Sequence, residues 1–352
     1  MNKPFRNITV VGTGTLGTQI ALLAGNAGYT VTVYDTRQGI LGETLNRLRS
    51  SIETKGIKPF VPWEQLEKVR DRIRETTNLD EAVQNADLIV ESVPEDLSIK
   101  QAVFQELGEK APFETILATN SSSMPVSLME ESSGRPEKCL NTHFYVILEG
   151  MNMADVMGGT KTTPEVLQKG VDWVRSMGCI ALTVKKELLG FCFNRVWRAI
   201  KREGLWMWGN GYVDFRDVDR AWMTFTKMKM GPFGIMDGVG LDVVRDIETV
   251  YYNESKDPKD KPPQALTDKI ERGELGVKSG RGFYTYPDPE FAQPEFLDST
   301  KEEGDWHLIS DLHMGTLSGF ETRRDGHFGR LKGDRSAVFD DDSLTQGHGG
   351  GA

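Results

Sequence analysis

Residues 7–35 constrain the fold more than any other stretch of the chain. They read as a β-branched run, a glycine-rich turn, a helix-forming run and a second β-branched run. Gly12 permits the tight turn after the first strand, and Gly14 lets the backbone approach a pyrophosphate. Gly17 lets the following helix pack closely against the sheet. This order of strand, turn and helix predicts a site for a dinucleotide.

The residues around this turn indicate which dinucleotide binds. Thr15 and Leu16 lie at the predicted start of the helix, where backbone N–H groups and the helix dipole favour phosphate. Asp35 ends the second strand, where a carboxylate can accept hydrogen bonds from both ribose hydroxyls. Because a carboxylate at this place repels a 2′-phosphate, Asp35 favours NAD over NADP. Arg37 follows closely and is interpreted as a solvated charge.

Composition narrows the classes of partner. The chain of 352 residues has a formal net charge of −10 and no long basic run, which argues against nucleic acid as a partner. No apolar stretch reaches the ~18 residues that span a bilayer, and the first strand begins too early for a signal peptide. The three cysteines match neither a disulfide framework nor a metal site, so we expect a cytoplasmic location.

The chain divides into two predicted domains and a tail. Short β-branched runs alternate with helical patterns over residues 1–187, which predicts an α/β domain with a parallel sheet. A polar helical hairpin over about 37–73 is inserted in this domain. Residues 188–287 read as almost wholly helical and form a second, all-α domain. The tail, 288–352, lacks periodicity and is predicted to be partly disordered.

One histidine stands out as a candidate for acid–base chemistry. His143 lies at the end of a predicted strand near 138–143, and that edge of an open α/β sheet faces the ligand. Histidine is the side chain best suited to move a proton near neutral pH. The remaining histidines fall in the tail: His307, His313, His327 and His348. We therefore expect His143 to be the catalytic base.

Several polar residues are candidates for work beside His143. A carboxylate that orients the imidazole would improve the base, and both Glu149 and Asp155 lie within reach along the chain. Ser122 follows a strand near 115–118, and Asn194 opens the first long helix of the second domain. Either side chain can hydrogen-bond a substrate oxygen, although Ser and Asn at such places also serve as caps or turns.

Two basic residues share a helix face with Asn194. Arg198 and Lys201 follow it at i+4 and i+7, which places all three side chains on one side of the helix. A guanidinium group suits a planar carboxylate through two parallel hydrogen bonds. We expect Arg198, supported by Lys201, to bind an anionic group of a small substrate. The alternative, that both charges are solvated or lie in a dimer interface, stays open.

Over about residues 5–287 the chain resembles the 3-hydroxyacyl-CoA dehydrogenase family. The similarity rests on several motifs in family order. They are the glycine turn at 10–17, Val-Glu-Ser-Val-Pro-Glu-Asp-Leu-Ser-Ile-Lys at 90–100, Ala-Thr-Asn-Ser-Ser-Ser at 118–123, Thr-His-Phe at 142–144, Gly-Phe-Cys-Phe-Asn-Arg at 190–195, Met-Gly-Pro-Phe-Gly at 230–234 and Gly-Val-Lys-Ser-Gly-Arg-Gly-Phe-Tyr-Thr-Tyr at 276–286. The resemblance implies a Rossmann domain followed by an all-α domain that forms a homodimer. It implies reversible, NAD-dependent oxidation of a 3-hydroxyl group in fatty acid metabolism.

The resemblance also assigns roles to individual residues. It makes His143 the general base and chooses Asp155 over Glu149 as its orienting carboxylate. It places Ser122 and Asn194 at substrate-oxygen positions. Three further residues lie near the cofactor by the same comparison: Glu95, Lys100 and Asn120.

The chain departs from the family pattern near the base. The family usually carries Glu where this chain has Asp155, and its usual His-Phe-Phe-Asn-Pro becomes His143, Phe144, Tyr145, Val146 and Ile147. The stretch at 154–162 looks closer to a diketoreductase-like branch that acts on small keto acids or esters. A small free 3-hydroxy or 3-keto carboxylate is therefore the alternative to a CoA ester. An NAD-binding structural or sensing protein without activity is a further alternative.

Overall fold

The computed structural model describes residues 3–54 and 57–297. The four histidines of the predicted tail, and residues 298–352 altogether, lie outside the described residues. The chain forms two compact units that divide between Glu203 and Gly204. The division predicted from the sequence, between 187 and 188, lies a short distance upstream.

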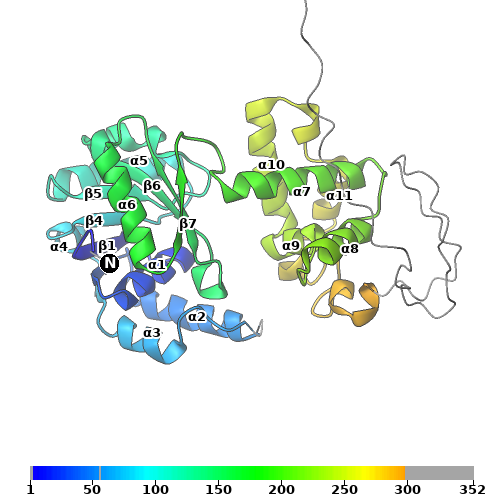
Figure 1. The fold of residues 1–352 in the computed structure, drawn as a ribbon, viewed down its shortest axis with the longest axis horizontal. Helices are drawn as coiled ribbons and strands as arrows, with labels where there is room; N and C mark the ends of the chain where they lie inside the picture. Colours follow the sequence, from blue (N-terminus) through cyan, green and yellow to red (C-terminus); the bar gives the residue numbers. More distant parts are fainter. Residues whose placement is uncertain (1–2, 55–56, 298–352) are drawn as a thin grey trace, which may run out of the picture. The chain divides into compact units, whose positions relative to one another are not determined.

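The first unit is built on one sheet of eight strands in the described part of the chain (Figure 1). The strands are β1 (Asn7–Val11), β2 (Thr30–Tyr34), β3 (Arg74–Thr76), β4 (Leu88–Glu91), β5 (Ile116–Thr119), β6 (Cys139–Phe144), β7 (Met153–Gly158) and β8 (Ile180–Val184). Their order is β3-β2-β1-β4-β5-β6-β7-β8. Since the strand order reverses between β1 and β4, the carboxyl ends of these two strands flank the crevice where such sheets bind ligands.

Helices cover both faces of this sheet. One face carries α1 (Thr15–Asn26), α2 (Ile40–Thr54), α3 (Trp63–Arg70) and α6 (Pro164–Ser176), and the other carries α4 (Leu79–Val83) and α5 (Leu97–Lys110). Successive strand residues point to opposite faces, so Val10 joins the first core and Val11 the second. Helices α2 and α3 form the inserted segment that the sequence predicts at about 37–73.

The last two strands depart from the parallel sheet that the sequence predicts. β1 to β6 pair in parallel, whereas β7 runs antiparallel to β6 and β8 is parallel to β7. The connection from β6 to β7 holds only a 3₁₀ turn, Ile147–Glu149, and Gly150 at φ 99°. A parallel return needs a crossover of about a dozen residues or more, so this short connection reverses the chain. As a result, His143 on β6 lies directly opposite Asp155 on β7.

The second unit is helical, as predicted. Helix α7 (Phe193–Gly209) leads into it, and α8 (Phe215–Thr226), α9 (Pro232–Val239), α10 (Leu241–Ser255) and α11 (Gln264–Glu271) follow. The Asp219 carboxylate accepts hydrogen bonds from the backbone N–H groups of Phe233 at 2.8 Å and Gly234 at 3.0 Å. A buried carboxylate of α8 thus satisfies the first turn of α9 and ties the two helices together.

The segment after α11 belongs to the core of the same unit. Asp237 of α9 accepts hydrogen bonds from the backbone N–H groups of Phe283 and Tyr284, each at 2.9 Å. Beyond them, Phe291 and Phe296 are each only 7% exposed and pack into the core. The packed body therefore includes residues 288–297, which the sequence pattern assigned to the tail.

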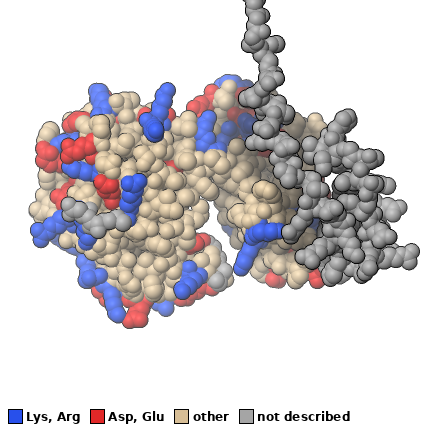
Figure 2. Space-filling view, in the orientation of Figure 1, with Lys and Arg blue, Asp and Glu red and all other residues tan. Residues whose placement is uncertain are grey.

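Charged side chains are interspersed on the surface of the first unit. In the face drawn in Figure 2, acidic and basic side chains lie side by side. Some of these neighbours form exposed ion pairs, such as Arg37 with Glu43 and Arg74 with Glu81. Within residues 3–54 and 57–297, we find no helix whose length and apolar character would let it span a bilayer.

Candidate active site

The glycine turn after β1 has the backbone geometry that a pyrophosphate site needs. Gly12 has φ +95°, and a Cβ there would lie 2.6 Å from the carbonyl oxygen of Ser92. A Cβ on Gly17 would collide with the carbonyl oxygen of Gly12. By contrast, a Cβ on Gly14, the N-cap of α1, would meet nothing within 4 Å. Gly12 and Gly17 are thus required by close packing, whereas Gly14 leaves the helix terminus open to an approaching phosphate.

A pocket of ≈ 520 Å³ lies at the carboxyl ends of β1, β2 and β4. The residues that line it come from the glycine turn, the end of β2 and the loop after β4: Val11, Gly12, Gly14, Tyr34, Asp35, Thr36, Ile40, Ser92, Val93 and Pro94. At its edge, Asp35 Oδ2 accepts hydrogen bonds from the backbone N–H and the hydroxyl of Thr13, both at 2.8 Å. The acid expected to bind ribose is therefore fixed in place by the glycine turn itself.

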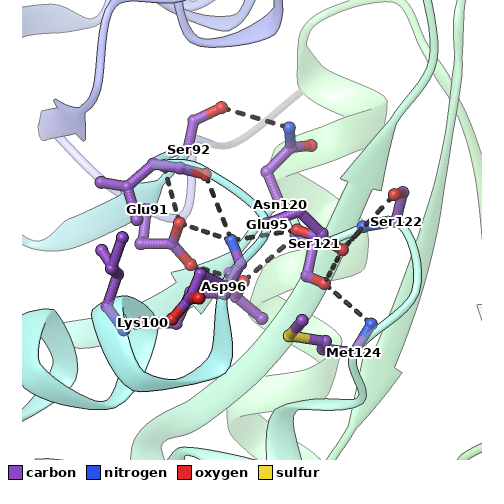
Figure 3. A network of polar contacts seen from close by, with 12 residues as sticks. Glu91, Ser92, Glu95, Asp96, Lys100, Asn120, Ser121, Ser122 and Met124 are labelled. Carbon is purple, nitrogen blue, oxygen red and sulfur yellow. Dashed lines mark hydrogen bonds and ion pairs between the residues drawn. The ribbon is translucent and has the colours of Figure 1, made fainter.

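A buried ion pair supports the other side of this edge (Figure 3). Lys100 on α5 is 1% exposed, and its ammonium group lies 2.8 Å from Glu91 Oε1 and 3.2 Å from Glu95 Oε2. Glu91, which ends β4, is 0% exposed. It also accepts hydrogen bonds from the Val93 N–H and the Thr119 hydroxyl, each at 2.7 Å. Lys100 thus links the end of β4 to the Glu95 loop from inside the protein.

Glu95 in turn holds the serine loop after β5 (Figure 3). Its Oε1 accepts hydrogen bonds from the Ser121 hydroxyl at 2.6 Å and from the backbone N–H groups of Ser122 and Ser123, each at 3.0 Å. Burial opposes the charged form, but the hydrogen bonds from Ser121 and Ser123 and the charge of Lys100 lower the pKa of Glu95 below its usual range. A charged Glu95 therefore fixes the loop and leaves Ser122 exposed.

Asn120 connects three strand ends at the same edge. Its side-chain carbonyl accepts the backbone N–H of Phe144 at 2.8 Å, and its amide group donates to the Ser92 hydroxyl at 3.3 Å. The ends of β4, β5 and β6 are therefore held at a fixed spacing. This arrangement brings the pocket residues, the serine loop and His143 to one edge of the sheet, as the sequence predicts.

His143 and Asp155 form a buried pair. They are 4% and 0% exposed, and His143 Nδ1 lies 3.4 Å from Asp155 Oδ2. The contact follows from the reversal at β7, because residues directly opposite in an antiparallel pair share one face of the sheet. Glu149, the other candidate carboxylate, lies in the turn between the two strands. The carboxylate that contacts His143 is thus Asp155.

The segment ahead of α7 reaches the same pair. The backbone N–H of Cys192 donates to Asp155 Oδ1 at 3.2 Å, and the Phe191 ring lies 5.3 Å from the His143 ring. Asn194 is the second residue of α7, two positions after Cys192, and it is half-buried. Further along α7, Arg198 is half-buried and Lys201 is only 4% exposed.

Comparison with known proteins identifies the family. The model of the 3-hydroxyacyl-CoA dehydrogenase NAD binding domain matches residues 7–188, and the model of the C-terminal domain matches residues 190–286. The chain belongs to the 3-hydroxyacyl-CoA dehydrogenase family. The NAD cofactor and the oxidoreductase class predicted from the sequence are thereby confirmed, and the glycine turn, the pocket and Asp35 fit that cofactor.

Relatives within the family differ in the substrates that their names give. The 3-hydroxybutyryl-CoA dehydrogenase of Clostridioides difficile is 30% identical over 284 residues, which cover 79% of this chain and 99% of that protein. The 5-formyl-3-hydroxy-2-methylpyridine 4-carboxylate 5-dehydrogenase of Mesorhizobium japonicum is 29% identical over 287 residues, 80% of this chain and 91% of that one. A solved diketoreductase structure is 34% identical, with a TM-score of 0.70, and covers 81% of this chain and 100% of its own.

Two residues of this dehydrogenase site were not singled out from the sequence as parts of the site. Glu91 ends a buried apolar strand, and nothing in the strand pattern shows that its charge is paired with Lys100. Tyr145 donates its hydroxyl to Asp155 Oδ2 at 2.5 Å. The signal for Tyr145 was available, because a residue two positions after His143 in a strand lies on the same face.

Proposed function

We propose that this dehydrogenase interconverts the 3-hydroxyl and 3-keto groups of an acyl substrate, with His143 as the general base. Bound NAD supplies the hydride acceptor or donor for C3. His143 takes the hydroxyl proton during oxidation and returns it during reduction. Asp155 supports the tautomer with the proton on Nδ1, which leaves Nε2 as the basic nitrogen. The observation that carries the proposal is the buried contact between His143 and Asp155.

Two further side chains are proposed to bind the reacting oxygen. Ser122 is an exposed residue on the loop that Glu95 holds, and its hydroxyl makes only a long contact of 3.4 Å with Glu95 Oε1. Asn194 lies in the first turn of α7, next to the segment that contacts Asp155. Donors that are fixed before the reaction stabilise a developing oxyanion more than mobile ones do. We propose that both donate to the oxygen on C3.

The cofactor residues of the proposal follow the geometry of the pocket. Gly12, Gly14 and Gly17, with Thr15 and Leu16 at the start of α1, surround the helix terminus that would face the pyrophosphate. Asp35 would accept the ribose hydroxyls. Glu95, Lys100 and Asn120 are proposed near the nicotinamide end, and Lys100 would act from its buried position through Glu95.

The direct test is to replace His143 by Ala. Loss of general acid–base catalysis should lower kcat by about 10²–10⁴-fold, while NADH affinity, measured by fluorescence titration, should stay close to that of the unmodified protein. Tyr29→Phe is the matched control and should keep its activity, because Tyr29 lies at the amino end of β2, away from the carboxyl ends that carry the site. A His143→Ala variant with undiminished kcat would place the base elsewhere.

The substrate is proposed to be a 3-hydroxyacyl-CoA or 3-ketoacyl-CoA ester. A small free 3-keto carboxylate is the second candidate, favoured by the position of Arg198 on the helix that begins beside the site. NADH oxidation with acetoacetyl-CoA and with a panel of free β-keto acids separates the two. If Arg198 binds a carboxylate, with Lys201 in support, Arg198→Leu should lower kcat/KM at least about thirtyfold on the free acid. Arg198→Lys is the matched control for charge alone, and an equal loss on both substrate classes would discard this role.

We also propose a homodimer formed through the helical domain. Val243, Ile247 and Val250 follow one face of α10 and are 41%, 37% and 50% exposed. An apolar stripe of this kind on a surface helix suits an interface. Sedimentation velocity of the protein and of Ile247→Lys tests it, and a monomer at all concentrations would refute it. A cytoplasmic location and a role in fatty acid metabolism complete the proposal, supported by three free cysteines and by the family.

A further inference from the structure

Tyr145 lies at the catalytic pair in a way that the family assignment does not explain. It follows β6 directly, its side chain is buried, and its ring lies 4.5 Å from the His143 ring at 70°, an edge-on contact. It also makes an edge-on contact with the Phe193 ring, at 5.3 Å and 84°. The phenol is therefore held between His143 and the start of α7.

The Tyr145 hydroxyl and the His143 imidazole share one oxygen. Tyr145 donates to Asp155 Oδ2 at 2.5 Å, whereas His143 Nδ1 lies 3.4 Å from the same atom. An O–H···O⁻ bond of about 2.5–2.7 Å is charge-assisted and strong, while an N···O distance beyond about 3.2 Å is a weak contact. The phenol, and not the imidazole, is thus the stronger partner of this carboxylate oxygen.

The groups that face Asp155 come from three segments. His143 and Tyr145 approach from β6 and its continuation, and Cys192 donates its backbone N–H to Oδ1 at 3.2 Å. On the far side, the register places the apolar Leu182 of β8 beside it. Burial, the hydrogen bond to Asp155 and the charge of that carboxylate all raise the pKa of Tyr145 above its usual value. Tyr145 therefore remains a donor throughout the working pH range.

We propose that Tyr145 is a positioning residue of this site, whose hydroxyl fixes the Asp155 carboxylate and shares the oxygen that faces His143. The inference rests on the proposed role of His143. Because the Tyr145 hydroxyl donates to Asp155 Oδ2, that oxygen offers less negative charge to the protonated form of His143. Holding the carboxylate keeps the imidazole in one orientation. Tyr145 thereby sets both the alignment of the base and the charge that faces it.

The test is Tyr145→Phe, which removes only the hydroxyl. A loss of alignment should lower kcat by about 10- to 100-fold with KM and NADH affinity nearly unchanged. The acid limb of the kcat/KM profile for oxidation should move up by about 1 pH unit, because the unshared carboxylate then stabilises the imidazolium. Tyr29→Phe is the matched control, since Tyr29 also hydrogen-bonds through its hydroxyl, to Ser176 at 2.6 Å, and should leave both quantities unchanged.

A double-mutant cycle shows whether Tyr145 acts through Asp155. Tyr145→Phe combined with Asp155→Asn should cost no more activity than Asp155→Asn alone, whereas multiplicative losses would overturn the inference. An unchanged pH limb and kcat in Tyr145→Phe would overturn it as well, provided that His143→Ala is inactive. If His143→Ala remains active, the proposed base is wrong, and that result is distinct from a failure of Tyr145. Melting temperatures of all variants confirm that each one is folded.

Discussion

Replacing Lys100 by Met should destabilise the first unit strongly, although Lys100 lies beside the cofactor edge and not at the centre of the core. Its ammonium group is 2.8 Å from Glu91 Oε1, and the two side chains are 1% and 0% exposed. Met has nearly the same length and leaves the packing of α5 intact. The change therefore removes one charge and leaves the carboxylate of Glu91 buried without its cation.

The size of the loss follows from what remains around Glu91. Removing one partner of a buried ion pair costs about 3–5 kcal/mol. Glu91 keeps hydrogen bonds from the Val93 N–H and the Thr119 hydroxyl, each at 2.7 Å, so we expect the lower end, about 3 kcal/mol. For a folding unit of 150–250 residues this corresponds to a fall in Tm of about 6–12 °C.

The assay is thermal unfolding followed by circular dichroism, with urea unfolding as a second measurement. Lys110→Met is the matched control, because Lys110 lies on the same helix but pairs with Asp80 and Glu106 at the surface. It should leave the Tm almost unchanged. Adding Glu91→Gln to Lys100→Met removes the stranded charge and should recover much of the loss. A Lys100→Met protein that melts within about 2 °C of Lys110→Met would refute the reasoning.

Three other predictions concern the cofactor, the pH dependence of stability and the end of the packed body. Asp35→Ala should narrow the difference between NADH and NADPH affinity by about tenfold, and equal affinities in the unmodified protein would contradict this role. Burial raises the pKa of Asp219 from 3.8 to about 6, so the folded protein holds a proton in that window and the free energy of unfolding falls as pH rises through it. Asp219→Asn should remove this pH dependence, which amounts to up to about 3 kcal/mol across the window. Urea unfolding at several pH values tests it, and the same pH dependence in both proteins would contradict the assignment. A chain that ends at Pro287 should be less stable than one that ends at Leu297 by about 3 kcal/mol or more, because it lacks two buried phenylalanines; equal melting temperatures would mean that they contribute little.

The glycine turn, Asp35 and His143 could be predicted because each follows from local chemistry. Only glycine tolerates φ +95° against the Ser92 carbonyl, so a glycine at position 12 after a β-branched run indicates the turn directly. An acid at the end of the next strand and a histidine at the end of another must meet at the same edge of a parallel sheet. These inferences need the order of the elements and little knowledge of packing.

The reversal at β7 and the burial of Lys100 could not be predicted in the same way. β7 reads Met-Ala-Asp-Val-Met-Gly, with one β-branched residue and a terminal glycine, so it lacks the alternating pattern that identifies a strand. Lys100 lies on a helix with little segregation of apolar side chains, and lysine there usually faces solvent. Its burial depends on Glu91 and Glu95, which approach from the strand end and loop before the helix. Such pairings are properties of the tertiary structure.

The environment of Asp155 affects how substitutions at this site should be interpreted. Its two oxygens accept from the Tyr145 hydroxyl, the Cys192 N–H and, more weakly, His143. An asparagine at 155 removes the charge from all three contacts, and because it keeps one acceptor oxygen and turns the other into a donor, it cannot preserve the contacts of both oxygens. The activity lost in Asp155→Asn therefore exceeds the contribution of the contact with His143 alone. Tyr145→Phe leaves the carboxylate and the contact with Cys192 in place, so it separates the alignment of the base from its charge, which a substitution at 155 cannot do.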